Sequence, residues 1–451
     1  MLNSTNTASK DCQQTHGNHC ALDEILAKPK TLEQTGVPTR VLESLLIKHL
    51  SQATDLDIVT LIDKLGLPGN LIEQLLQKLK AEALTEVRTD GRFHTGMRYG
   101  LTQKGMIMAQ HELQRDGYLG PVPITIDSYK KLVCEQSSKR ETITPERMKQ
   151  GLSDLILSEE VISQVGPALN SGRAIFIYGL PGTGKTYISR RLVRLFESNV
   201  YIPYAVCIGN QVIQVFDPII HTPINTRLQR SLHLNEGHDN RLVLCRRPEV
   251  VVGGELTAEM LEVTVDPTFR INRAPLQMKA NNGIFLIDDL GRQKVSVDAI
   301  LNRWIIPLEE GIDYLSLPSG EHFDIPFEQV LVFSSNIHPA KLADDAFLRR
   351  IGYKISFGPI TQDDYCYLWH SECEKHGLTT APEGLDFVIG HLHQVNNIPL
   401  LPCYPRDLVA MCSNQISFFQ HPPQINHQLI EVVWRCYFVD HDQAGGNHGE
   451  G

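Results

Sequence analysis

The chain has 451 residues, of which 42% are hydrophobic and 21% are charged, and its formal net charge is −10 at pH 7. These values predict about three globular domains with enough apolar residues for a large core, and the negative charge argues against a protein that coats nucleic acid or anionic membranes. No apolar run reaches the roughly 18 residues that a membrane span needs. The polar N-terminus has no signal-peptide core and the ten cysteines form no CxxC pair, so we expect a cytoplasmic protein with reduced thiols.

The first predicted domain, at residues 36–116, follows a polar tail at 1–35 for which we expect disorder with a short helix at 22–26. Apolar residues at helical spacing predict three helices in this domain, and two short extended segments after them predict a hairpin. The helices are expected near 41–50, 56–65 and 71–79, and the strands at 84–88 and 97–102. Three helices followed by a hairpin are typical of a winged-helix domain.

Winged helices commonly bind DNA, but the charges of this domain do not favour that role. Residues 36–116 contain ten Lys/Arg and ten Asp/Glu, and the third helix has no run of Arg, Asn or Gln suited to reading base edges. We therefore expect the domain to dock a protein or to regulate the rest of the chain. DNA binding stays open as an alternative because the hairpin is basic, with Arg88, Arg92, His94 and Arg98.

Residues 117–150 are predicted to be a linker, because they contain a Gly-Pro-Val-Pro segment at 120–123 and then a charged run. Strands and helices alternate in the next range, 151–360, which predicts a parallel, doubly wound sheet with its ligand at the carboxyl ends of the strands. Four helix-like segments then occupy residues 361–440. The final segment, 441–451, is expected to be a disordered tail.

The strongest motif lies near the start of the range 151–360. It is a P-loop that fits GxxxxGK[ST] at every fixed position, with the sequence Gly179, Leu180, Pro181, Gly182, Thr183, Gly184, Lys185 and Thr186. Apolar residues predict a strand before the loop, at 174–178, and a helix after it, at 188–196. The backbone N–H groups of such a loop can cradle the phosphates of a nucleotide, with Lys185 at the β/γ-phosphates and the Thr186 hydroxyl on Mg²⁺.

Two later strands end in polar side chains. The apolar run at 283–287 is followed by Asp288 and Asp289, which resembles a Walker B motif. One carboxylate is needed for the Mg²⁺ shell, a role that we assign to Asp288, and the next orients or deprotonates the attacking water, a role that we assign to Asp289. The strand at 330–335 ends at Asn336, whose amide could hydrogen-bond the γ-phosphate or that water.

These three motifs, in this order, resemble those of AAA+ ATPases, and the third matches the sensor-1 asparagine of that family. A hairpin at 313–325 before the third strand is typical of the bacterial clade that includes MoxR-like ATPases. The resemblance covers about residues 150–440 and implies ATP and Mg²⁺ as ligands. It implies an α/β fold with a P-loop doubly wound parallel sheet at 151–360 and a C-terminal helical lid at 361–440, here preceded by the winged helix.

The resemblance also points to three arginines. In AAA+ proteins an arginine finger from one subunit completes the ATP site of its neighbour, and the segment 344–351 matches its position. Arg350 is the first candidate for this finger and Arg349 is the second. Arg406, at the start of a lid helix, matches the sensor-2 arginine. The family pattern thus implies a homo-oligomer, arranged as a hexameric ring, that hydrolyses ATP.

Two departures from the family pattern leave the function open. The second Walker B carboxylate is usually Glu, so Asp289 raises the alternative of a slow, nucleotide-dependent switch. The stretch 211–282 is longer than a minimal AAA+ core needs, and it lacks the aromatic-hydrophobic-glycine signature of a substrate-gripping loop. We expect an ATPase that remodels or regulates an unknown protein partner. The other alternative is a DNA-associated ATPase that helps replication, transposition or transcription.

Overall fold

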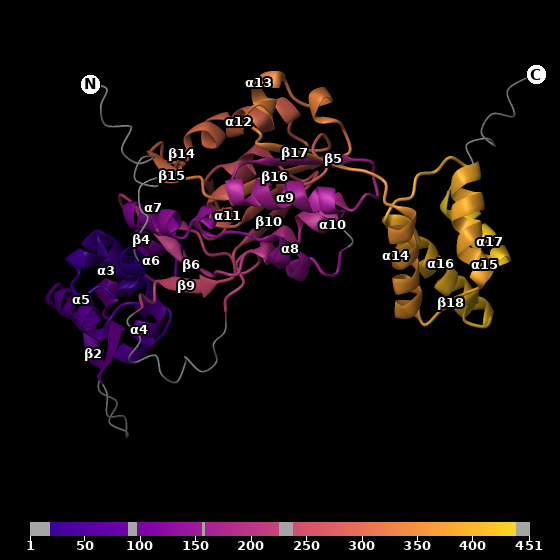
Figure 1. Cartoon of the computed structure of the whole chain (residues 1–451). Helices are drawn as coiled ribbons and strands as arrows, with labels where there is room; N and C mark the ends of the chain where they lie inside the picture. Colours follow the sequence, from indigo (N-terminus) through magenta and orange to yellow (C-terminus); the bar gives the residue numbers. More distant parts are fainter. Residues whose placement is uncertain (1–18, 89–96, 156–157, 225–237, 439–451) are drawn as a thin grey trace, which may run out of the picture.

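The computed structural model describes residues 19–88, 97–155, 158–224 and 238–438. Figure 1 shows a strand-rich core between two largely helical groups, one from the N-terminal part of the chain and one from the C-terminal part. The tail predicted at 441–451 lies outside the described residues. The tail predicted at 1–35 is ordered from residue 19 on, where it forms α2 (His19–Leu26) and the 3-10 helix η1 (Glu33–Thr35). The short helix expected at 22–26 is therefore present, whereas the disorder expected for the rest of 19–35 is wrong, because Leu26 is buried in one cluster with Ile124 and Tyr129.

The helices and hairpin expected at 36–116 are present, together with one additional strand. The elements are α3 (Thr39–Leu50), β1 (Leu56–Asp57), α4 (Ile58–Leu65), α5 (Gly69–Ala81), β2 (Thr85–Arg88), β3 (Arg98–Leu101) and α6 (Gln103–Arg115). Asp57 caps α4 by accepting a hydrogen bond from the Thr60 amide at 2.7 Å, and Gly66 ends this helix in a left-handed conformation. The strands form an antiparallel sheet in the order β1-β3-β2, and α6 packs against α3.

A five-stranded sheet forms the centre of the molecule, and all of its strand pairs are parallel. In spatial order its strands are β10 (Glu249–Val252), β13 (Ile284–Ile287), β16 (Val330–Ser335), β5 (Ile175–Gly179) and β17 (Tyr353–Phe357). Successive residues of a strand point to opposite faces. Phe285 therefore clusters with Trp304 of α12 (Val297–Glu310), whereas Leu286 clusters with Leu169 of α9 (Glu159–Ser171). Helices cover both faces of the sheet, so the predicted α/β class with a parallel sheet is confirmed.

A second five-stranded sheet, of mixed direction, accounts for much of the long stretch before Asp288. It has the order β11-β12-β8-β7-β4, with strands β4 (Ile124–Thr125), β7 (Ala205–Ile208), β8 (Gln211–Gln214), β11 (Thr264–Val265) and β12 (Asn272–Arg273). Two further pairs are antiparallel, β6 (Val200–Pro203) with β9 (Leu242–Cys245) and β14 (Ile312–Ser316) with β15 (His322–Pro326). The pair β14–β15 is the hairpin expected at 313–325.

The short helices between residues 151 and 360 are α10 (Lys185–Ser189), η3 (Leu192–Leu195), η4 (Ala258–Leu261), α11 (Leu276–Ala280), η5 (Pro339–Lys341) and α13 (Asp345–Leu348).

The range predicted as a linker, 117–150, is folded. It supplies strand β4 and then α7 (Ile126–Glu135), the 3-10 helix η2 (Ser138–Arg140) and α8 (Pro145–Gly151). Tyr129 and Leu132 of α7 are buried in one cluster with Leu315 and Ile325 of the hairpin β14–β15. The linker prediction is wrong because its Gly-Pro signal describes only a local turn, whereas the residues that bury α7 lie far along the chain.

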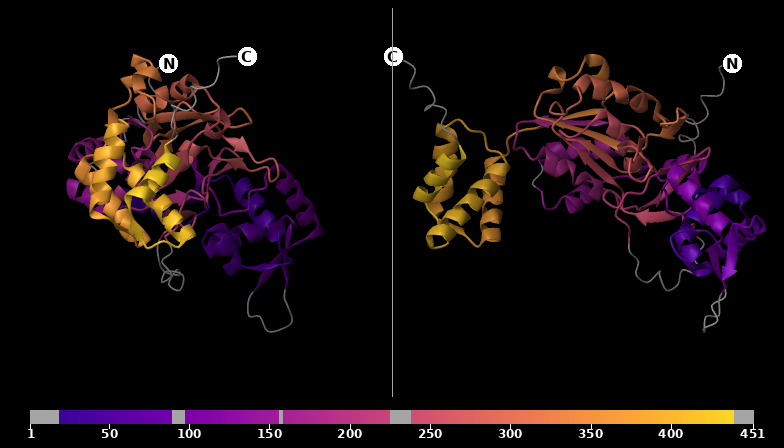
Figure 2. Two further views of the ribbon diagram at one scale, coloured as in Figure 1. Left: turned by 90° about the vertical axis from the view of Figure 1, so that its right-hand side faces the viewer. Right: turned by 180° about the vertical axis from the view of Figure 1, so that it is seen from behind.

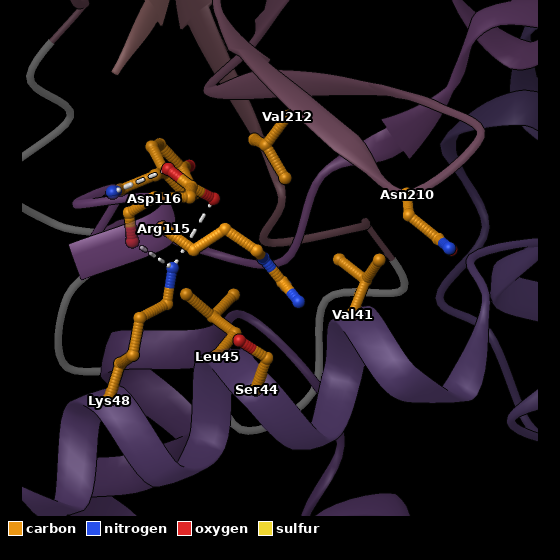
Figure 3. A pocket seen from close by; sticks show the side chains of 9 residues that line it. Val41, Ser44, Leu45, Lys48, Arg115, Asp116, Asn210 and Val212 are labelled. Carbon is orange, nitrogen blue, oxygen red and sulfur yellow. Dashed lines mark hydrogen bonds and ion pairs between the residues drawn. The ribbon is translucent and has the colours of Figure 1, made fainter. Parts of the chain in front are cut away.

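The N-terminal helical group shares a hydrophobic core with the mixed sheet. Leu45 of α3 lies in one buried cluster with Ala205 and Val212 of strands β7 and β8. Figure 3 shows a small pocket at this contact, lined by residues of α3, the end of α6 and the β7–β8 turn. Here the buried Lys48 ammonium lies 3.0 Å from the Asp116 carbonyl oxygen and 3.4 Å from its carboxylate. The two parts are therefore packed against each other.

A helical bundle ends the described chain, and in Figure 2 it forms a group of its own at one end of the molecule. Its elements are α14 (Gln362–His376), β18 (Thr379–Thr380), α15 (Pro382–Phe387), the π-helix η6 (Val388–His393), α16 (Cys403–Phe419), β19 (Gln424–Ile425) and α17 (His427–Tyr437). Trp369, Cys412 and Trp434 are buried in its core. The four helical segments expected between 361 and 440 are thus present.

The cysteines differ in part from the expected reduced state. Seven described cysteines are free, whereas Cys134 of α7 is disulfide-bonded. The spacing of cysteines along the sequence does not tell which of them meet in space, so this bond could not be foreseen. Among the helices that the structure describes, none has both the length and the apolar character that crossing a membrane requires.

Candidate functional site

The turn after β5 is built on glycines whose backbone suits few other residues. Gly179, Gly182 and Gly184 have φ angles of 151°, 86° and 84°, in the region that favours glycine. A Cβ atom on Gly179 would lie 2.0 Å from the Phe357 carbonyl oxygen of β17, so no larger residue fits without a shift. The turn leads into α10 and then η3, which together are less regular than the helix expected at 188–196. Strand, glycine turn and helix nevertheless follow one another in the expected order.

Lys185 follows this turn and is buried. Its ammonium Nζ donates hydrogen bonds to the carbonyl oxygens of Gly179, at 3.0 Å, and Leu180, at 2.8 Å. Burial lowers the pKa of this ammonium, and the carboxylates of Asp289 and Asp288 oppose that shift. The lysine side chain therefore places its amino group at the turn and within electrostatic reach of both carboxylates.

Parallel pairing brings the acidic strand end beside the glycine turn. Ser335 of β16 pairs with Tyr178 of β5, and β13 pairs in register with β16, so the three strands end at the same edge of the sheet. At this edge the Thr186 hydroxyl donates to a carboxylate oxygen of Asp288 at 3.0 Å. Hydroxyl and carboxylate oxygens are ligands that Mg²⁺ accepts. The donor set at this point therefore fits a magnesium ion.

Asp289 and Asn336 meet at the same edge. Nδ2 of Asn336 donates to Oδ1 of Asp289 at 3.2 Å. Asp289 has a φ angle of 50°, a left-handed conformation that Asp and Asn tolerate better than other residues with a Cβ atom. Both side chains are only partly buried, so the carboxylate can reach a water molecule. A carboxylate held in this way can orient such a water or accept its proton.

The predicted arginines make contacts elsewhere. The guanidinium of Arg350, the first candidate for the finger, is 2.6 Å from the Glu309 carboxylate. Arg349, the second candidate, is exposed and makes no ion pair within the described part of the chain. Arg406 contacts the neighbouring Asp407 at 2.9 Å. Of the two finger candidates, Arg349 is thus the more available to a second molecule, which reverses the order expected from the sequence.

Cys403 is a neighbour of the glycine turn that sequence reasoning missed. A Cβ atom on Gly182 would lie 2.5 Å from the Cys403 Sγ atom, and one on Gly184 would lie 4.0 Å from Pro402. The first turn of α16, which also carries Arg406, therefore lies against the glycine turn. Burial raises the pKa of the Cys403 thiol to about 11, so this thiol is neutral at pH 7. No motif in the sequence marks this contact, because it joins segments more than 200 residues apart.

Comparisons with known proteins assign a family model only to the C-terminal bundle. Residues 361–436 match the model described as Domain of unknown function (DUF8689). These residues correspond to the helices α14 to α17. No curated protein matches the chain.

Among solved structures the chain has distant structural similarity to two proteins. The RuvB Holliday junction branch migration motor of Thermotoga maritima matches with a TM-score of 0.36 and 11% identity, over 64% of this chain and 72% of RuvB. NtrX from Brucella abortus in complex with ADP matches with a TM-score of 0.36 and 12% identity, over 70% of this chain and 62% of NtrX. A second NtrX structure gives a TM-score of 0.41 at 12% identity, over 66% of this chain and 61% of that one. Similarity of this extent does not define the activity of the chain.

The basic hairpin that left DNA binding open as an alternative is partly neutralised. Arg88 forms an ion pair with Glu86 at 2.9 Å, and Arg98 forms an ion pair with Asp55. The other two basic residues, Arg92 and His94, lie outside the described residues. Because Arg88 and Arg98 already have carboxylate partners, they offer little net charge to DNA phosphates.

Proposed function

We propose that the chain is an AAA+ ATPase that binds Mg·ATP and hydrolyses it in a homo-oligomer, in order to remodel or regulate a protein partner. The observation that carries this proposal is the 3.0 Å contact between the Thr186 hydroxyl and the Asp288 carboxylate. It joins a glycine turn with a buried lysine to the acidic end of a neighbouring parallel strand. This combination is what phosphoryl transfer from a nucleotide requires, because positioning and charge stabilisation supply most of its catalysis.

Each residue of the edge has a role in this proposal. The amides of the turn and the ammonium of Lys185 hold the phosphates. Thr186 and Asp288 supply oxygen ligands for Mg²⁺, which when bound neutralises the charge that develops on the phosphates. Asp289 orients the attacking water and accepts its proton, while the 3.2 Å hydrogen bond from Asn336 fixes that carboxylate.

The proposal is tested by ADP release from ATP by the purified full-length chain, with and without EDTA. We expect release that depends on Mg²⁺, because the Thr186 and Asp288 oxygens alone carry no positive charge to offset the phosphates. A chain that neither binds ATP nor releases ADP would overturn the proposal. If EDTA leaves the release of ADP unchanged, the role proposed for Mg²⁺ is wrong.

The partner is proposed to dock on the winged helix, residues 36–116. Protein is favoured over DNA because Arg88 and Arg98 are already paired with carboxylates. The core that this part shares with the mixed sheet, through Leu45 and Val212, supports a rigid connection between a docked partner and the rest of the molecule. The slow-switch alternative remains a second candidate, because the left-handed backbone at Asp289 suits Asp but does not lengthen its carboxylate.

Replacing Arg349 with alanine is expected to lower kcat at least about tenfold, because a finger supplied by a neighbour stabilises charge on the transferring phosphoryl group. Arg350→Ala is the matched variant, and we expect it to have the smaller effect, since Arg350 is held by Glu309 at 2.6 Å. The measurement is ADP release at a protein concentration that supports the oligomer. Arg406 is proposed to sense the nucleotide from α16 and is left intact in both variants.

A mixture of two inactive variants tells whether Arg349 acts between subunits. Lys185→Ala subunits retain Arg349, and Arg349→Ala subunits retain the P-loop, so a mixed oligomer contains some complete sites. Partial recovery of hydrolysis on mixing is the expected result. If the mixture is no more active than the separate variants, the finger does not act in trans.

A further inference from the structure

The turn that follows β13 has an unusual backbone at two of its positions. Asp289 has a φ angle of 50° and Gly291 one of 107°. Residues with a Cβ atom rarely adopt this region, and they remain there only where the surrounding structure holds them. The contacts of the turn should therefore reveal which residue maintains the conformation of Asp289.

One side of the turn is held by strand β16. The Leu290 amide donates to the Ser334 carbonyl oxygen at 2.8 Å, and the Ser335 hydroxyl donates to the Leu290 carbonyl oxygen at 2.8 Å. Leu290 itself is buried in the cluster on the α12 face of the sheet. These contacts fix the residue after Asp289 but leave the carbonyl group of Asp289 unconstrained from that side.

On the other side of the turn the Asp289 carbonyl oxygen accepts a hydrogen bond from the Arg292 amide at 3.0 Å, and beside it lies the side chain of Gln293. Its amide nitrogen Nε2 donates to the carbonyl oxygens of Asp288, at 2.9 Å, and Asp289, at 3.2 Å. Its Oε1 atom accepts a hydrogen bond from the Gly291 amide at 2.8 Å. Gln293 thus binds the backbone on both sides of the left-handed residue, through both ends of its amide group. An amide is suited to this task because it donates and accepts at once.

Arg292 is a weaker candidate for the same role. Its guanidinium lies 3.9 Å from the Asp289 carboxylate, and its side chain is 72% exposed. Exposed ion pairs of this length contribute little, because water screens the charges and the long side chain is free to move. The Arg292 amide bonds the Asp289 carbonyl oxygen at 3.0 Å, whereas the Gln293 side chain bonds the backbone of Asp288, Asp289 and Gly291 together.

We propose that Gln293 is a positioning residue for hydrolysis, which keeps Asp289 in its left-handed conformation so that the carboxylate meets Asn336. The inference rests on the proposed ATPase function and concerns the same site. The direction of the Cβ atom follows from φ and ψ, so a change in the backbone of Asp289 swings its carboxylate away from the position set by the 3.2 Å contact with Asn336. Gln293 touches neither nucleotide nor water in this account and acts through Asp289.

The test compares Gln293→Ala with Gln293→Glu in the full-length chain. Gln293→Glu keeps the size of the side chain and the acceptor for Gly291, but places an oxygen where Nε2 faces two carbonyl oxygens. We expect kcat for ATP hydrolysis to fall about 10- to 100-fold in both variants, since a misplacement of about 1 Å can cost about a hundredfold. The Kd for Mg·ATP should change by less than about twofold, because the lost interaction matters only for the reaction step.

A double-mutant cycle with Asp289→Asn separates positioning from general damage. Once the carboxylate is gone, Gln293→Ala should lower the residual rate no further, because its effect passes through that carboxylate. Gln164→Ala serves as the control, since the Gln164 amide makes only a 3.5 Å contact with Glu160 on the distant helix α9. The control should leave kcat and the melting temperature unchanged.

The outcomes distinguish this inference from the proposed function. A wild-type chain that hydrolyses ATP, with kcat unchanged in Gln293→Ala and Gln293→Glu, would contradict the role of Gln293 and leave the ATPase proposal standing. An equal loss of rate with and without the Asp289 carboxylate would also contradict it, because the effect would then be a general one. A wild-type chain without any ATP hydrolysis overturns the proposed function and the positioning role with it.

Discussion

Replacing Lys185 with alanine is expected to lower kcat/KM for ATP hydrolysis by at least about 10³-fold, because a charged donor is lost where phosphate charge grows in the transition state. The ammonium is held at the glycine turn by the carbonyl oxygens of Gly179 and Leu180. The phosphates of a nucleotide bound there would accept hydrogen bonds from this ammonium in place of the carbonyl oxygens. The measurement is steady-state ADP release over a range of ATP concentrations, together with direct ATP binding.

Lys354→Ala provides a matched control for this variant. The Lys354 ammonium also donates to a backbone carbonyl oxygen, that of Ile351 at 2.8 Å, but its residue is exposed on β17. Its removal should leave kcat/KM within about twofold of the wild-type value, as is usual for surface substitutions. Undiminished hydrolysis by Lys185→Ala would show that the reaction occurs at another site.

Asp289→Asn is expected to lower kcat by about 10³-fold while Mg·ATP still binds, since a positioned general base contributes about 10²- to 10⁴-fold. Asn has the same size as Asp and tolerates the left-handed backbone equally well. Its side-chain oxygen can still accept the hydrogen bond from Asn336, so the fold of the turn should be retained. Single-turnover hydrolysis and the Kd for Mg·ATP measure the two effects separately. Asp298→Asn, which changes an exposed carboxylate in the first turn of α12, is the control.

The stalled Asp289→Asn variant also serves to identify the partner. Recovered from cells with ATP present, it should retain a defined protein that is lost when Lys185→Ala is added. Recovery of nuclease-sensitive DNA in place of a protein would favour the DNA-associated alternative, and the affinity should then fall steeply with salt because phosphate contacts release counterions. Hydrolysis by Asp289→Asn at the wild-type rate would contradict the role of this carboxylate.

The parts of the fold that could be predicted are those with a local cause. Apolar residues at helical spacing place α3, α4 and α5 within a few residues of the expected ranges, because one face of each helix must be buried. The glycine turn at 179–184 follows its strand and precedes a helix as expected, and its three glycines have backbone conformations that favour glycine over residues with a Cβ atom. Thr186 and Asp288, both assigned to Mg²⁺ from the sequence, lie 3.0 Å apart because parallel strands end at one edge of the sheet.

Other features depend on segments that meet only after folding. The linker prediction at 117–150 failed because its helix α7 is buried by the hairpin β14–β15, which a local Gly-Pro signal cannot reveal. The preference for Arg350 over Arg349 changed because Glu309, on α12, pairs with Arg350. Neither partner could be inferred from spacing along the chain.

The sequence by itself determined the helices α3 to α5, the strands β5, β13 and β16 with the glycine turn, and the polar residues that follow these strands. Those properties follow from periodicity, glycine conformation and strand direction, which act over a few residues. Only the tertiary structure decided that Cys403 of α16 lies against the glycine turn, that α3 packs on the mixed sheet, and that Gln293 holds the backbone of Asp289. These contacts depend on how side chains from distant segments fill shared space and satisfy one another's hydrogen bonds, and no single segment of the sequence contains that information.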